Sequence, residues 1–125
     1  MDSLKNQKFV TVLMAVYNGE DWLERSISSV LNQTYSNFEF IIVNDGSQDN
    51  TKKIAERFAL ADSRIRIFHK EHTGLADSLN YGLDRATGIW IARLDVDDIC
   101  RLDRLEKQVE AISVNKKHVL IGSGL

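Results

Sequence analysis

Short apolar runs alternate with segments of helical periodicity along nearly the whole chain. Four of these runs are apolar on both faces and predict buried strands at Phe9–Val16, Phe38–Val43, Arg64–Phe68 and Ile89–Leu94. A fifth strand is predicted at His118–Gly122. Strands of this kind are typical of a sheet that is covered on both sides.

Between the strands, apolar residues recur at helical spacing and predict four amphipathic helices. The residues on their apolar faces are Trp22, Leu23, Ser26, Ile27, Val30 and Leu31; then Ile54, Ala55, Phe58 and Ala59; then Leu75, Leu79, Leu83 and Ala86; and finally Leu102, Leu105, Val109 and Ile112. Gly88 follows the third pattern and is predicted to cap that helix at its C-terminus.

Strands that alternate with helices predict an α/β fold, a Rossmann-like and mainly parallel sheet with helices on both faces. A chain of 125 residues is expected to form one domain, residues 1–125. In such folds ligands bind beyond the carboxyl ends of the strands. The residues that directly follow each strand are therefore the candidates for function.

Charge and composition narrow the class of protein. A formal net charge of −2 provides no basic field for nucleic acid or an anionic membrane. A single cysteine, Cys100, forbids an internal disulfide and suits a reducing compartment. No apolar run approaches the roughly 20 residues of a membrane-spanning helix. We expect a cytoplasmic protein without a transmembrane segment or a nucleic-acid partner.

Tyr17 and Asn18 follow the first strand, and Asp45 ends the second. The ring of Tyr17 offers a surface on which a planar ligand can stack. The Asp45 carboxylate can accept hydrogen bonds from a nucleobase or a ribose. The alternative is local: Asn18 or Glu20 caps the first helix, and residues of the stretch "DGSQDN" cap the second.

His69, Lys70 and His72 follow the third strand. Their side chains can contact an anion, or they can simply form a polar loop. Neither the glycine fingerprint of dinucleotide-binding proteins nor the lysine motif of P-loop proteins occurs in the chain. Both of those classes are therefore disfavoured.

Three carboxylates crowd the stretch "RLDVDD", directly after the fourth apolar run. In an extended strand Asp95 and Asp97 would lie on the same face, where two carboxylates make a site for Mn²⁺ or Mg²⁺. Such a cation is completed by substrate phosphates. Alternatively, Asp97 or Asp98 caps a helix that starts near Arg101, and Arg93 neutralises another of the acids.

Three stretches in this order resemble the nucleotide-sugar-binding part of family 2 glycosyltransferases with the GT-A fold: "VTVLMAVYNGEDWLERSISSVLNQTYSNFEFIIVNDGSQDNT", "GLADSLNYGLDRATGIWIARLDVDD" and "RLDRLEKQV". The resemblance covers nearly the whole chain. It implies that Tyr17 lies beside the base, that Asp45 hydrogen-bonds the base, and that Asp95 lies near the ribose or the sugar. It also implies that Asp97 binds the metal that bridges the diphosphate.

The same resemblance places Ala15, Asn18 and Val96 in the donor site, with Lys70 or His72 contacting the base. Asn44 is a departure, since many relatives carry a second acid before Asp45. The donor implied is a nucleotide sugar, a UDP-sugar by family habit. The acceptor is a saccharide or lipid-linked saccharide, in bacterial polysaccharide synthesis at the inner face of the membrane.

The reaction implied is an inverting, metal-dependent transfer. Family members usually continue past the length of this chain, and their later part supplies the acceptor site and the general base. We therefore expect a truncated protein that binds donor without the base. The alternatives are a Mg²⁺-dependent phosphoryl-transfer enzyme and a non-catalytic nucleotide-binding module. The first is disfavoured because "YNGE" follows the first strand, where the haloacid dehalogenases carry their nucleophile.

Overall fold

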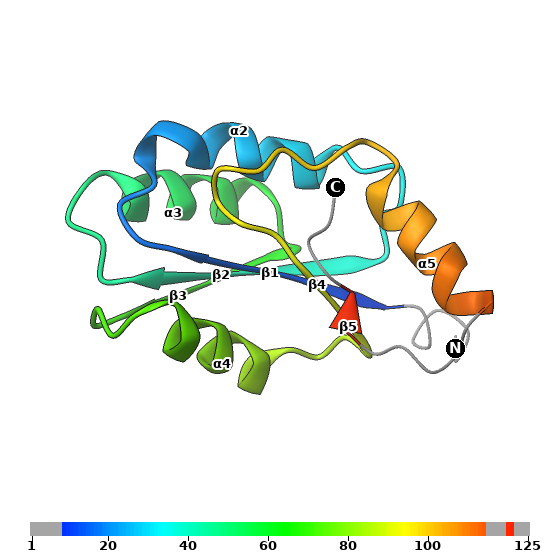
Figure 1. Ribbon diagram of the computed structural model, residues 1–125. Coiled ribbons are helices and arrows are strands. Elements are labelled where there is room, and N and C mark those ends of the chain that lie inside the picture. The colour runs from blue at the N-terminus through cyan, green and yellow to red at the C-terminus, as the bar shows by residue number, and fades with distance from the viewer. Residues whose placement is uncertain (1–8, 115–119, 122–125) are drawn as a thin grey trace.

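The computed structural model of the protein describes residues 9–114 and 120–121 and confirms the α/β prediction (Figure 1). A five-stranded sheet, in which every strand pair is parallel, is flanked by helices on both faces. The elements along the chain are β1 (Val10–Val16), α2 (Glu20–Leu31), β2 (Phe38–Asp45), α3 (Thr51–Ala61), β3 (Ile65–Lys70), α4 (Leu75–Arg85), β4 (Trp90–Arg93), α5 (Arg104–Val114) and β5 (Leu120–Ile121).

The strand order is β3-β2-β1-β4-β5. The chain builds outward from β1 to β3, then returns to the other side of β1 to add β4 and β5. The order therefore reverses between β1 and β4, and the crevice at such a reversal is where open α/β sheets bind ligands. The segments that flank this crevice follow Val16 and Arg93.

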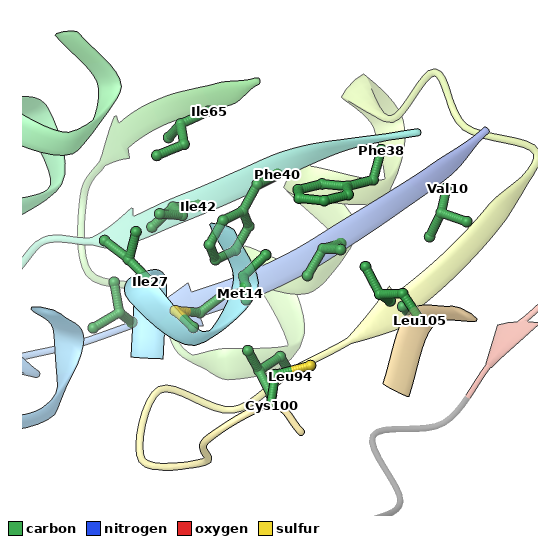
Figure 2. Close-up of a cluster of buried hydrophobic side chains, with 14 of the residues drawn as sticks. Val10, Met14, Ile27, Phe38, Phe40, Ile42, Ile65, Leu94, Cys100 and Leu105 are labelled. Atoms are coloured by element: carbon green, nitrogen blue, oxygen red, sulfur yellow. The ribbon is translucent and has the colours of Figure 1, made fainter. Parts of the chain in front are cut away.

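The main hydrophobic core lies between the sheet and helices α2, α3 and α5 (Figure 2). Met14 and Phe40 point from β1 and β2 into this layer, where Ile27 of α2 meets them. Leu105 of α5 and the thiol of Cys100 close the core near β4. Burial raises the pKa of the Cys100 thiol, so this residue is a small packing group.

Helix α4 covers the opposite face of the sheet, and small residues make the contact (Figure 1). Ser78 and Gly82 are its buried positions. Of the predicted apolar face, Leu79 and Ala86 pack against the sheet, whereas Leu75 and Leu83 are exposed. A Cβ atom added to Gly82 would lie 2.3 Å from the Leu13 side chain. At Gly82 the helix approaches the sheet so closely that no side chain fits between them.

Gly88 does not cap α4, contrary to the prediction, because the helix ends at Arg85. Instead the Gly88 N–H donates to Thr11 Oγ1 at 2.9 Å, and a Cβ atom here would lie 2.5 Å from the Thr11 nitrogen. Thr11 donates in turn to the buried carboxylate of Glu39, which also accepts from the Thr87 N–H. The absence of a side chain at Gly88 lets the chain enter β4 against β1.

One further boundary differs from the predictions. Helix α5 begins at Arg104, so Leu102, which was placed on its apolar face, lies before the helix and is exposed. Of the fifth strand predicted at His118–Gly122, the structure describes Leu120–Ile121. The rest of that prediction lies outside the described residues, as does the side chain of Ile112.

Candidate functional site

A cavity of about 250 Å³ opens at the carboxyl ends of β1 and β2. Seven residues line it: Ala15, Val16, Tyr17, Asp45, His72, Gly74 and Leu75. Three of these, Ala15, Tyr17 and Asp45, were predicted from the sequence to bind donor. The wall thus combines apolar surface, two aromatic rings and one carboxylate.

Asp45 is the last residue of β2 and is only 3% exposed. The loop after β3 wraps around its carboxylate. The N–H groups of Thr73 and Gly74 donate to Oδ1 and Oδ2 at 2.9 and 3.0 Å. Lys70 Nζ lies 3.0 Å from Oδ1, and His72 Nδ1 lies 3.0 Å from Oδ2. The carboxylate therefore organises the loop that forms one wall of the cavity.

These donors decide the charge of Asp45. Burial alone would raise the pKa of its carboxyl, but the Thr73 N–H, the Lys70 ammonium and the Gly74 N–H outweigh burial and lower the pKa to about 2. The group is a carboxylate at neutral pH. It can accept hydrogen bonds from a ligand, but it cannot donate one or act as an acid there.

Lys70 is held inside the loop. Its ammonium donates to Asp45 Oδ1 at 3.0 Å, to the carbonyl of Glu71 at 2.7 Å and to the hydroxyl of Thr73. An ammonium has three N–H groups, and these three acceptors use them. The predicted contact of Lys70 with a base would require the loss of one of these bonds.

Tyr17 and His72 form a stacked pair at the mouth of the cavity. Their ring centroids are 4.0 Å apart, and the planes are inclined by 25°. His72 Nδ1 faces two acceptors, Oδ2 and the main-chain oxygen of Asp45, so Nδ1 carries a proton. Sequence reasoning missed this pairing, because it depends on the loop after β3 folding back across β2 to reach β1.

The loops after β1 and β2 cap each other's helices. Asn18, with a positive φ of 51°, turns the chain into α2. The local caps predicted for Asn18 and Glu20 are absent, and neither helix start has a side-chain cap from its own N-cap residue. Instead, hydrogen bonds join the two loops. Three N–H groups of the first loop donate to side chains of the second: Asn18 to Ser47, Gly19 to Thr51 and Glu20 to Asp49. Two bonds run the other way, from the N–H of Gln48 to the side chain of Asn18 and from the N–H of Asn50 to the side chain of Glu20. The stretch "DGSQDN" does supply a local bond to α3, because Asp49 Oδ1 accepts from the Thr51 N–H at 2.9 Å.

A contact between Gly19 and Val96 brings the acidic stretch beside these loops. A Cβ atom added to Gly19 would lie 3.0 Å from one Val96 methyl carbon and 2.6 Å from the Val16 side chain. Further along, Ser26 of α2 donates to the carbonyl of Asp98 at 3.0 Å. The stretch after β4 therefore lies against the N-terminal half of α2, across the crevice from the cavity.

The acidic stretch is a turn, not a continued strand. Strand β4 ends at Arg93, and the Asp98 N–H donates to the Asp95 carbonyl at 3.0 Å. The argument that Asp95 and Asp97 share a strand face was therefore wrong. Arg93 lies 3.2 Å from Asp95 Oδ1 and balances that carboxylate, one of the alternatives considered from the sequence. Asp97 is at the exposed tip of the turn.

The alternative of a helix cap is not realised, because α5 starts at Arg104 and Asp103 is the acid that directly precedes it. Asp97 and Asp98 instead line a small hollow of about 20 Å³ with Trp22, Arg25, Val96 and Ile99. The Asp97 carboxylate is exposed and therefore accessible to a ligand.

Oxygen donors of this kind fit a hard divalent cation such as Mn²⁺ or Mg²⁺. Within the described residues, no group of three or more histidine, cysteine, aspartate or glutamate side chains forms a ready cage. A hard cation does not need one when it binds through one or two carboxylates and completes its shell with substrate phosphates. Asp97 fits that role, with Asp95 as the neighbouring acid.

The structure therefore places the Tyr17 ring and the Asp45 carboxylate on one side of the topological switch point, and the turn that carries Asp95 and Asp97 on the other.

Among the helices that the structure describes, none is long and apolar enough to cross a membrane.

The chain belongs to glycosyl transferase family 2, because the model of that family matches residues 11–124. This confirms the resemblance seen in the sequence. An uncharacterized glycosyltransferase of Haemophilus influenzae is 40% identical over 123 residues, which are 98% of this chain and 38% of that protein. The chain thus spans about two-fifths of the length of this relative.

Solved structures show the same fold. TarS of S. aureus, in complex with UDP-GlcNAc, matches 86% of this chain and 32% of its own with a TM-score of 0.80 at 23% identity. The mannosyltransferase PcManGT of Pyrobaculum calidifontis, in complex with GDP-Man and Mn²⁺, matches 82% of this chain and 31% of its own with a TM-score of 0.73 at 26% identity.

Proposed function

We propose that residues 1–125 form the donor-binding part of a glycosyltransferase and bind the nucleoside diphosphate of a nucleotide sugar across the β1–β4 crevice. The observation that carries this proposal is the pairing of the Tyr17–Asp45 cavity with the exposed acidic turn on the two sides of one switch point. Membership of family 2 supports it, as do the nucleotide sugars bound by the two solved neighbours.

In this proposal the base lies in the cavity. The ring of Tyr17 supplies a stacking surface, and the buried Asp45 carboxylate accepts from an N–H of the base. Ala15, at the end of β1, forms the floor. A uracil is the expected base; GDP-Man in PcManGT makes guanine the alternative that an experiment must include.

The diphosphate lies toward the acidic turn, where Asp97 holds a divalent cation. Asp95 and Val96 lie beside the ribose and the sugar, and Asn18 borders the path between base and diphosphate. When bound, the cation would supply Lewis-acid stabilisation of the departing diphosphate. Arg93 Nη2 lies 3.2 Å from Asp95 Oδ1, so Asp95 is paired with a cation of the protein and Asp97 is the carboxylate proposed to hold the metal.

The reaction is an inverting displacement at the anomeric carbon. The acceptor hydroxyl forms a new C–O bond, the bond from the anomeric carbon to the diphosphate breaks, and a base takes the hydroxyl proton. The protein's own part in this is to bind and orient the donor. No residue of this chain is assigned as the base, and the acceptor is a saccharide or lipid-linked saccharide.

Calorimetric titration of UDP and GDP, in Mn²⁺ and then in chelator, tests the proposal. We expect saturable binding of one nucleotide that weakens at least tenfold without the cation. Absence of binding by a chain shown to be folded would contradict it. Binding in a longer form of the protein without sugar transfer to any acceptor would favour a non-catalytic module.

A further inference from the structure

His72 occupies the place that the proposed function gives to the base. Its ring covers one face of Tyr17 with centroids 4.0 Å apart, and its Nδ1 faces Asp45 Oδ2 at 3.0 Å. We propose that His72 is a side-chain gate: it closes the base site of the free protein and must swing away before a base can stack on this face of Tyr17 and bond Asp45. This inference rests on the proposed function, and it adds that the His72 side chain competes with the base for Tyr17 and Asp45.

The hydrogen-bonding capacity of the Asp45 carboxylate is already used in the free protein. A carboxylate has about four lone-pair positions. Four donors lie within 3.0 Å of its oxygens: the N–H groups of Thr73 and Gly74, the Lys70 ammonium and His72 Nδ1, which is also hydrogen-bonded to the main-chain oxygen of Asp45 at 3.1 Å. The Ser78 hydroxyl is a further group that lowers the pKa of this carboxyl. A base N–H can bond this carboxylate only if one of these donors leaves.

The burial of the four donors shows which one can leave. The N–H groups of Thr73 and Gly74 belong to the main chain that enters α4. The Lys70 side chain is only 14% exposed and has two further acceptors. The His72 side chain is 54% exposed. Rotation of His72 into solvent therefore frees a lone pair of Asp45 at the smallest structural cost.

The movement is one of the side chain and not of the loop. Gly46, with a positive φ of 72°, presses against the main chain of His72, and a Cβ atom on Gly46 would lie 2.6 Å from the His72 nitrogen. The bonds of Thr73 and Gly74 to Asp45 hold the next two residues. The backbone that carries the imidazole is thus fixed on both sides, and the freedom that remains is rotation about the side-chain bonds.

A gate of this kind lowers the apparent affinity for nucleotide, because only the molecules in which the gate is open can bind. The apparent affinity equals the affinity of the open form multiplied by the fraction of open molecules. One part-buried hydrogen bond, from His72 Nδ1 to the main-chain oxygen of Asp45, and one ring contact hold it closed, which corresponds to roughly a three- to tenfold effect on affinity. A nucleotide that offers both stacking and an N–H donor can displace His72. A ligand that offers only phosphate does not compete with it.

The test compares UDP binding, in Mn²⁺, by the wild-type chain and by His72→Ala, His72→Phe and Glu71→Ala. We expect His72→Ala to bind UDP about three- to tenfold more tightly. His72→Phe keeps a ring over Tyr17 but loses the donor, so its affinity should lie between the two. Glu71→Ala, an exposed change in the same loop, should match wild type. GDP is titrated in the same way and replaces UDP if it binds more tightly.

A second readout follows the gate itself. In the free wild-type protein, NMR should show a nuclear Overhauser contact between the rings of Tyr17 and His72, and saturation with nucleotide should abolish it.

Wild-type binding with equal or weaker binding by His72→Ala would overturn the gate and leave the proposed function standing. Persistence of the ring contact in the saturated complex would do the same. If neither wild type nor any variant binds UDP or GDP, the gate and the proposed function both fail.

Discussion

Gly19 and Val96 touch across the topological switch point, with only 3.0 Å between a Cβ atom placed on Gly19 and a Val96 methyl carbon. Gly19 belongs to the loop that carries Tyr17, and Val96 belongs to the turn that carries Asp97. This contact therefore sets the distance between the two halves of the candidate site. Because Gly19 has no side chain, its main chain itself packs beside Val96 and fixes the separation between the two segments.

Gly19→Ala tests that contact. The added methyl group would overlap Val16 and Val96, so we expect a loss of about 1–3 kcal/mol in the free energy of unfolding. Displacement of the acidic turn should also weaken Mn²⁺-dependent nucleotide binding. Urea unfolding and calorimetry measure the two effects. Wild-type values for both would show that the turn accommodates the methyl group freely.

Asp45→Asn should destabilise the protein in a pH-dependent way. The folded-state pKa of Asp45 is about 2 against an ordinary value of 3.8, so its carboxylate stabilises the fold above pH 3.8, and this contribution is lost as the pH falls toward 2. The difference corresponds to about 2 kcal/mol. Wild type and variant should therefore differ in urea unfolding at pH 7 and converge toward pH 2.5. A difference that is independent of pH would contradict the assignment.

Asp97→Asn should leave stability unchanged, because the side chain is exposed at the tip of the turn. It should reduce Mn²⁺-dependent nucleotide affinity by at least tenfold, since the variant loses the charged oxygen ligand. Asp103→Asn is the matched control, an acid that directly precedes α5 and lies outside the turn. Equal effects of the two changes would mean that the loss comes from net charge and not from a specific ligand.

Glu39→Gln should cost stability without affecting the site. Glu39 Oε2 accepts from the Thr11 hydroxyl at 2.6 Å and the Thr87 N–H at 2.7 Å, and Arg66 pairs with Oε1 at 2.8 Å. An amide in this place turns a donor toward a donor, so we expect a loss of about 1.5–3 kcal/mol.

Nucleotide affinity should match wild type in the same variant, because Glu39 lies near the start of β2 and the cavity lies at its end. Glu106→Gln, at an exposed glutamate, is the control for stability and should change it by less than about 0.5 kcal/mol. A weakened nucleotide site in Glu39→Gln would reveal coupling along the strand.

Strands β1 and β2 could be predicted because they are apolar runs buried on both faces, a pattern that can be recognised without knowledge of the tertiary structure. The contact face of α4 could be predicted only in part. Leu79 and Ala86 pack against the sheet as the helical periodicity predicts, but Leu75 and Leu83 belong to the same pattern and are exposed. Ser78 and Gly82 are buried because they are small, and small residues do not contribute to hydrophobic periodicity.

The position of the candidate site could be predicted better than its shape. Asp45 and Asp97 are candidates because Asp45 ends one strand and Asp97 follows another, and the carboxyl ends of parallel strands meet at one edge of the sheet. The turn from Asp95 to Asp98 was read as strand, although aspartate is favoured at the first position of a turn. The stacking of His72 on Tyr17 cannot be predicted from the local sequence, because the two residues are 55 positions apart and come together only in the folded protein.

The most direct test of the central claim is to map UDP binding by amide chemical shifts in Mg²⁺, with a trace of Mn²⁺ added to broaden the signals nearest the cation. The account predicts shifts after β1, at Asp45 and in the loop after β3, and Mn²⁺ broadening centred on Asp97. Shifts confined to other surfaces, or broadening centred away from the acidic turn, would contradict it.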